Sequence, residues 1–129
     1  MKIYKIVIIL SIILLISSCG TKYPIKDTPK DLRGNKDSLI KIIEYSDTEC
    51  PYCKGFHQTL KKVMDEYGKD VKVAWVYRNF PLAGLHEKAF HESEALECAA
   101  ELGGNDKFWQ YTDRLYEVTT SNDGLDVAE

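Results

Sequence analysis

Apolar and polar positions recur with different periods along the chain, and each period predicts an element. Residues 39–45 form a mostly apolar run with many β-branched side chains, which is typical of a strand buried on both faces. In residues 71–77 apolar and polar side chains alternate, which predicts a second strand. Residues 50–67 carry apolar side chains three and four positions apart, which predicts an amphipathic helix between the strands. The three elements imply a right-handed βαβ unit.

The chain after the second predicted strand has a helical pattern. Residues 86–102 are rich in Ala and Glu and stop at Gly103 and Gly104. Asn105 is a favourable N-cap for a further helix. The fold class is therefore α/β, with a helical layer after the βαβ unit. The core between strands and helices is expected to contain Trp75, Tyr77, Phe80, Phe108, Trp109, Tyr111 and Tyr116.

The N-terminus has a pattern of its own. Lys2 and Lys5 precede an apolar stretch, residues 6–16, that is well short of the roughly 20 residues needed to cross a bilayer. This predicts a signal peptide over residues 1–18. The residues that end at Cys19 resemble a bacterial lipobox, so Cys19 is expected to become the lipidated N-terminus; an ordinary thiol near a cleavage site is the alternative. A lipid anchor implies a location outside the cytoplasm, where disulfides persist.

Residues 19–37 are expected to form this lipidated end and a polar tether, because they contain Pro24, Pro29 and scattered charges. The folded domain is then expected over residues 38–129. The formal net charge is −3 and no basic block is present, which excludes nucleic acid as a partner.

The chemistry is expected at Cys50-Pro51-Tyr52-Cys53, where the first strand gives way to the helix. A thiol in the first helical turn faces unpaired backbone N–H groups and the positive end of the helix dipole, which stabilise its thiolate. Cys50 is therefore expected to be the exposed nucleophile. Cys53 lies one turn later on the apolar side of the helix, so it is expected to be the shielded, resolving thiol within disulfide reach of Cys50.

Other interpretations of this motif stay open. A Cys-x-x-Cys pair can be half of a zinc site or a structural disulfide, although the sequence has no second ligand pair at a recognisable spacing. His57 lies one turn after Cys53 and could complete a metal site with Cys50 and Cys53. A non-catalytic metal-binding or structural lipoprotein is therefore the competing class. Ordinary packing or exposure is the simpler expectation for His57.

Five other polar or reactive residues receive ordinary expectations. His86 and His91 are expected on a helix surface, and Cys98 as a buried small thiol among alanines. Asp47 and Glu49 are expected to be exposed charges that oppose a nearby thiolate only weakly, because salt screens them.

The chain resembles the DsbA-like thiol:disulfide oxidoreductases in four segments, which are Glu44–His57, Tyr77–Leu82, Ala95–Ala99 and Lys107–Tyr111. The resemblance implies a thioredoxin-like fold with a helical insertion and a redox-active disulfide between Cys50 and Cys53. It also implies that Glu44, six positions before Cys50, is a buried carboxylate that exchanges the proton of the shielded thiol. The alternative for Glu44 is a solvated strand residue.

The resemblance further implies a function. The protein would oxidise or exchange disulfides in secreted proteins with its two thiols and no soluble cofactor. Its partners would be thiol or disulfide proteins and a quinone-linked membrane oxidase that resets the pair. The protein is expected to be a monomer anchored at Cys19. Glutaredoxins carry the same tetrapeptide but lack the helical insertion.

The C-terminal end departs from the family. DsbA-like proteins continue after the helical insertion with another helix, an antiparallel strand pair and a cis-proline loop, whereas residues 124–129 look only like the start of a helix. The C-terminal strands are therefore expected to be missing from this sequence, and the resemblance does not imply that the chain is active by itself. The open edge of the strand at residues 71–77 is the expected site of association.

Overall fold

The computed structural model describes residues 31–70 and 72–122. They contain the strands β1 (Leu32–Gly34), β2 (Ile40–Ser46) and β3 (Val73–Asn79) and the helices α2 (Pro51–Tyr67) and α3 (Ala89–Val118). Within these residues no helix combines the length and the apolar character needed to cross a membrane. The expected signal peptide and Cys19 lie outside the described residues.

The predicted βαβ unit is confirmed, because β2 pairs with β3 in parallel and α2 connects them. A third strand was not expected. β1 pairs antiparallel with β3, with Leu32 opposite Val76, and the strand order is β1-β3-β2. The tether expected over residues 19–37 therefore does not include residues 32–34, which form β1. A strand of three residues is too short to produce a periodic pattern.

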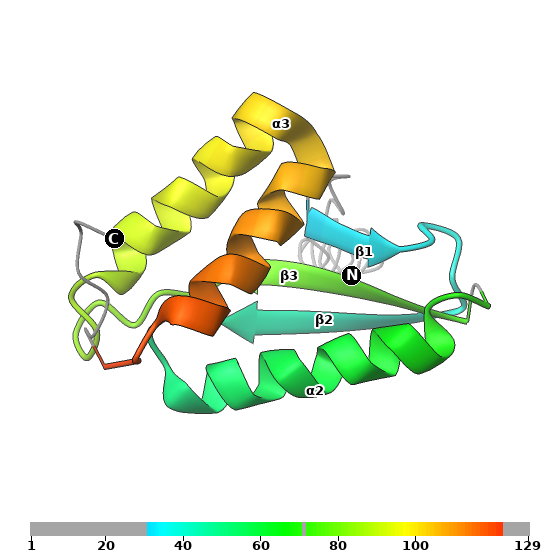
Figure 1. The fold of residues 1–129 in the computed structure, drawn as a ribbon, viewed down its shortest axis with the longest axis horizontal. Helices are drawn as coiled ribbons and strands as arrows, with labels where there is room; N and C mark the ends of the chain where they lie inside the picture. The colour runs from blue at the N-terminus through cyan, green and yellow to red at the C-terminus, as the bar shows by residue number, and fades with distance from the viewer. Residues whose placement is uncertain (1–30, 71, 123–129) are drawn as a thin grey trace, which may run out of the picture.

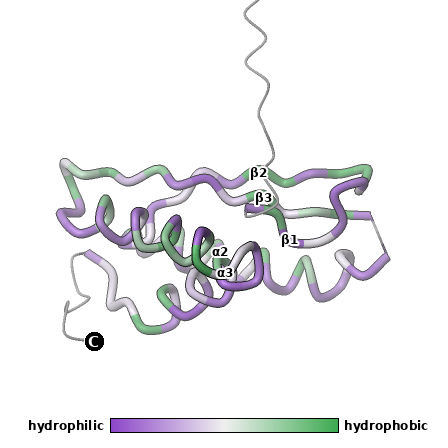
Figure 2. Tube along the Cα trace, turned by 90° about the horizontal axis from the view of Figure 1, so that it is seen from above, coloured by the Kyte–Doolittle hydropathy of each residue, from purple (hydrophilic) through white to green (hydrophobic). Residues whose placement is uncertain are grey.

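Both helices cover the same face of the sheet. Figure 2 shows β2 and β3 along one side of the molecule and α2 and α3 on the other. The core between them combines side chains of β3, α2 and α3, which are Trp75, Tyr77, Leu60, Met64, Leu96, Phe108, Trp109, Leu115 and Tyr116. The expected aromatic core is thus confirmed at five positions, but Phe80 and Tyr111 are exposed.

Strand β2 is not buried on both faces as its apolar run predicted. Ile40, Ile43 and Tyr45 are exposed, whereas Glu44 and Ser46 are buried against the helices. β3 lies between β1 and β2, so the expected free edge at β3 is also wrong. Among the described strands, the open edges are those of β1 and β2.

Helix α3 consists of two helical halves separated by Gly104, whose φ of 69° and ψ of −163° are not helical. Figure 1 shows the two halves meeting at a sharp corner. The two predicted helices are therefore confirmed, with the break at the predicted glycines. The first half begins at Ala89, later than the predicted residue 86, so His86 lies in the preceding loop.

Candidate functional site

Cys50 is the N-cap residue of α2. Its φ of −77° and ψ of 122° are extended, and Pro51 follows as the first helical residue. The Cys50 carbonyl accepts the first helical hydrogen bond, from the Lys54 N–H at 3.0 Å. No side chain caps the helix. The half-buried Cys50 thiol therefore lies at the helix end where unpaired N–H groups and the helix dipole favour a negative charge.

Cys53 lies one turn further along α2. It is also half-buried and does not form a disulfide bond. It interacts with the Cys50 thiol, with the Ser46 hydroxyl and with the backbone of Asp47. Burial raises the pKa of the Cys53 thiol, which keeps it protonated until a base accepts its proton. The two thiols are therefore neighbours, and both are half-buried.

Glu44 lies on β2 with its side chain in the core, so the solvated alternative is wrong. Its Oε2 accepts a hydrogen bond from the Trp75 indole N–H at 2.8 Å, and its Oε1 has no hydrogen-bond partner within the described part of the chain. Burial raises the pKa of Glu44, and hydrogen bonds from Ser46 and Trp75 oppose this only in part. A buried carboxyl group with a raised pKa holds a proton more readily than an exposed one, so it is suited to take or return a proton.

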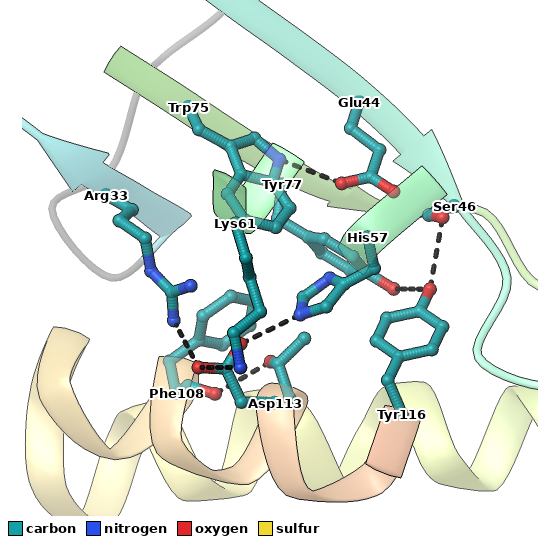
Figure 3. Close-up of polar contacts among 11 residues, drawn as sticks. Arg33, Glu44, Ser46, His57, Lys61, Trp75, Tyr77, Phe108, Asp113 and Tyr116 are labelled. Carbon is teal, nitrogen blue, oxygen red and sulfur yellow. Dashed lines mark hydrogen bonds and ion pairs between the residues drawn. The ribbon is translucent and has the colours of Figure 1, made fainter. Parts of the chain in front are cut away.

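Two buried tyrosines complete the polar surroundings of the Cys53 thiol. The Tyr77 and Tyr116 hydroxyls lie 2.9 Å apart, and the Tyr116 hydroxyl donates to the Ser46 hydroxyl at 3.0 Å (Figure 3). Burial raises the pKa of both tyrosines, so both remain neutral hydroxyl donors. The hydroxyls form a chain that ends at Ser46 beside Cys53.

The acidic residues before Cys50 are buried, which corrects the expectation of exposed charges. Asp47 and Glu49 are 2% and 0% exposed. Asp47 Oδ1 accepts the Glu49 N–H at 2.8 Å, and Oδ2 accepts the Leu82 N–H at 2.6 Å and lies 3.0 Å from His86 Nδ1. Asp47 therefore stabilises the loop before α2 and connects it by a hydrogen bond to the loop after β3.

The expectations for the histidines and Cys98 have mixed outcomes. His91 is exposed as expected, but His86 is buried because it faces Asp47. Cys98 is exposed, not buried as expected, because it lies on the outer side of α3.

The alternative of a metal site is not supported by the position of His57. Its imidazole is fully buried, and Nε2 lies 2.8 Å from Asp113 Oδ1. Residues 31–70 and 72–122 contain no group of three His, Cys, Asp or Glu side chains that could hold a metal ion. Cys50, Cys53 and His57 therefore do not form the ligand set that was considered.

Trp75, Tyr77 and Tyr116 were expected only as core residues, and Ser46 was not expected in the site. The Ser46 side chain lies on the same face of β2 as Glu44, because it is two positions later in a strand. The two-residue spacing from Glu44 was the sequence feature that could have placed Ser46 in the site. No sequence feature indicated a role for the polar atoms of the three aromatic residues, because their hydrogen-bond partners lie on other elements.

A family model described as thioredoxin matches residues 26–127. The chain belongs to the thioredoxin family. The crystal structure of DsbA2 from Pseudomonas aeruginosa superposes with a TM-score of 0.67 and 33% identity, over 75% of this chain and 52% of that chain. The thioredoxin-like fold with a DsbA-type helical insertion is thereby confirmed.

Two curated relatives match this thioredoxin domain in sequence. The Na(+)/H(+) antiporter NhaA 1 of Mycolicibacterium gilvum is 34% identical over 82% of this chain but only 16% of its own length. The probable disulfide bond formation protein D of Bacillus cereus is 30% identical over 65% of this chain and 38% of its own length. The chain thus spans much less than half of either protein.

Proposed function

We propose that this protein is a thiol:disulfide oxidoreductase that oxidises or exchanges disulfides in secreted proteins. The observation that carries the proposal is the pair of adjacent thiols at the start of α2, where Cys53 interacts with the buried Ser46 hydroxyl and that hydroxyl hydrogen-bonds to the buried Glu44 carboxyl. The names of the P. aeruginosa and B. cereus relatives support the same chemistry. No soluble cofactor is required, because the two thiols carry both electrons.

The reaction has two steps. The Cys50 thiolate attacks a substrate disulfide, forms a mixed disulfide and releases one substrate thiolate. Glu44 then accepts the Cys53 proton, and the Cys53 sulfur attacks the Cys50 sulfur. The bond to the substrate breaks, and the second substrate sulfur leaves as a thiolate that takes up a proton. Two electrons pass from the cysteine pair to the substrate. The reverse sequence oxidises a substrate dithiol.

The proposed location is outside the cytoplasm, on a lipid anchor at Cys19. A quinone-linked membrane oxidase would reoxidise the pair, and the protein would act as a monomer on thiol or disulfide proteins. The N-terminal sequence pattern supports the anchor. Replacing Cys19 by Ser is expected to abolish metabolic labelling with palmitate, and labelling that persists would contradict the anchor.

Reduction of insulin by dithiothreitol and oxidative refolding of a reduced ribonuclease test the activity. The wild-type chain is expected to accelerate at least one of the two reactions. Cys50→Ala should abolish this acceleration, and Cys53→Ala should trap the mixed disulfide on Cys50. Cys98→Ala is the matched control, because Cys98 is exposed on α3 and should not affect either assay. A wild-type chain without effect in both assays would contradict the proposal.

A further inference from the structure

His57 is a buried polar residue that the proposed reaction does not use. It lies one turn after Cys53 on α2, and its side chain is 0% exposed. Because the Asp113 carboxylate can only accept, the 2.8 Å contact means that His57 donates through Nε2–H. Burial lowers the pKa of His57, so the imidazole is neutral at neutral pH. The ring is therefore held in one tautomer and one orientation.

Asp113 is held in turn by cations from two other elements. Its Oδ2 lies 2.9 Å from Arg33 Nη2 of β1 and 3.5 Å from Lys61 Nζ of α2. Burial opposes its ionisation, but hydrogen bonds from His57 and Arg33 lower the pKa of Asp113 to about 2. Figure 3 shows the carboxylate among these three side chains. The acceptor for the His57 N–H is therefore charged and fixed at neutral pH.

The His57 ring contacts two aromatic residues that hydrogen-bond to Ser46, which interacts with the resolving thiol, and to Glu44, which interacts with Ser46. The His57 ring centroid is 4.4 Å from that of Tyr116 and 4.8 Å from that of Trp75. Tyr116 holds the Ser46 hydroxyl, and Trp75 holds the Glu44 carboxyl. Figure 3 shows these side chains around the imidazole. The imidazole thus contacts both Tyr116 and Trp75, the residues that hydrogen-bond to Ser46 and Glu44.

We infer that His57, oriented by Asp113, is a positioning residue for the step in which Cys53 resolves the mixed disulfide. An imidazole with a hydrogen bond to a fixed carboxylate cannot rotate, so it sets the planes of the two aromatic rings beside it. Their hydrogen bonds in turn set the Ser46 hydroxyl beside the thiol and the Glu44 carboxyl beside that hydroxyl. A phenyl ring would fill the same space without this constraint. The inference rests on the proposed function, since it concerns the resolving step of that reaction.

The inference predicts an effect on one step only. Attack by Cys50 on a disulfide uses the start of α2 and needs neither the Glu44 carboxyl nor the Ser46 hydroxyl. Resolution by Cys53 requires proton transfer across a short distance, and such transfers lose efficiency when the groups are displaced by a fraction of an ångström. Loss of the His57 constraint should therefore slow resolution and leave the first attack unchanged.

The test measures both steps in the full chain with Cys19→Ala and Cys98→Ala, which leaves Cys50 and Cys53 as the only thiols. Oxidised glutathione is the probe substrate. Attack by Cys50 releases one glutathione and forms the mixed disulfide, and attack by Cys53 releases the second. Acid quenching at timed intervals followed by mass spectrometry of the protein gives both rate constants.

Four variants separate the constraint from charge and packing. His57→Phe keeps an aromatic ring and loses the hydrogen bond. Asp113→Asn and Asp113→Leu both remove the charge, but only Asn keeps an acceptor for the His57 N–H. His91→Phe places a phenyl ring at an exposed position of α3 as the matched control.

His57→Phe and Asp113→Leu are expected to slow release of the second glutathione by about tenfold or more. Release of the first should stay within about twofold of the parent, and Asp113→Asn should restore most of the resolution rate. His91→Phe should leave both steps unchanged.

Three results would overturn the inference. The first is an unchanged resolution rate in His57→Phe, and the second is a parallel slowing of both steps. The third is equal resolution rates in the two Asp113 variants, which also decides the matter if His57→Phe does not fold. A parent protein that forms no mixed disulfide would instead refute the proposed function itself.

Discussion

Replacing Glu44 by Gln tests whether a buried carboxyl group titrates beneath α2. Glu44 is 4% exposed, and a Gln side chain can still accept the hydrogen bond from Trp75. The substitution therefore removes the titration and keeps the shape and the main contact. Because burial raises the pKa of Glu44 above its usual value of 4.5, the wild-type protein carries an ionised buried carboxylate only above the raised value.

The sign of the effect follows from linkage. A carboxyl group whose pKa is higher in the folded than in the unfolded state stabilises the fold below its unfolded pKa. That contribution is lost as the pH rises through the folded pKa. Each pH unit between the two pKa values corresponds to about 1.4 kcal/mol of unfolding free energy. Between acidic and alkaline pH, Glu44→Gln should therefore gain stability on the wild type by that amount for each pH unit by which the folded pKa exceeds the unfolded one.

Guanidinium unfolding of the reduced proteins at several pH values measures this gain. The folded pKa of Glu44 is obtained separately from the fluorescence of Trp75 in a Trp109→Phe background, because the carboxyl group contacts the indole N–H. Glu101→Gln, an exposed position of α3, is the matched control and should follow the wild-type pH dependence. A difference between Glu44→Gln and wild type that stays constant with pH, or that falls with rising pH, would refute the reasoning.

Three further substitutions, at Asp113, Gly104 and Gly55, have predictable effects on stability. The pKa of Asp113 is lowered from 3.8 to about 2, so its charge stabilises the fold above pH 3.8 and this contribution is lost as the pH falls through about 2. In urea unfolding, Asp113→Asn should therefore be less stable than wild type by about 2 kcal/mol at neutral pH, with the difference shrinking in acid; a pH-independent loss would contradict this. A Cβ added at Gly104 has no atom within 4 Å. Gly104→Ala should therefore lower the free energy of unfolding by about 1–3 kcal/mol, measured by thermal unfolding, because of the positive φ alone. Gly55→Ala, in the open helical surface of α2, should stabilise by about 0.5–1 kcal/mol, and equal effects at the two glycines would contradict the strain argument.

The sequence was sufficient for the elements with strong local signals. The βαβ unit, the helix that begins at Cys50-Pro51 and the break at Gly104 all follow from periodicity, capping and glycine chemistry. These features depend on neighbours within a few positions. The face of β2 that is exposed could not be predicted in the same way, because its apolar run does not reveal that both helices lie on one side of the sheet.

The remaining parts of the site depend on partners that are distant in sequence. Asp47 is buried because the backbone of Leu82, 35 positions away, donates to it. His57 is buried because Asp113, 56 positions away, accepts a hydrogen bond from its imidazole. In each case the local sequence predicted a residue that is exposed or simply packed, without a specific long-range partner. The energy that reverses this expectation comes from hydrogen bonds that only the folded chain can form.

These long-range contacts give the two thiols different surroundings, although they are one helical turn apart. Cys50 meets backbone N–H groups at the start of α2, which any sequence with a helix at this point would provide. Cys53 meets Ser46 and the backbone of Asp47, whose positions depend on β2 and on the loop that Asp47 holds. The nucleophilic role proposed for Cys50 therefore depends on local geometry and is robust to changes elsewhere in the fold. The resolving role proposed for Cys53 depends on the tertiary structure, so substitutions far from the motif should affect resolution before they affect the first attack.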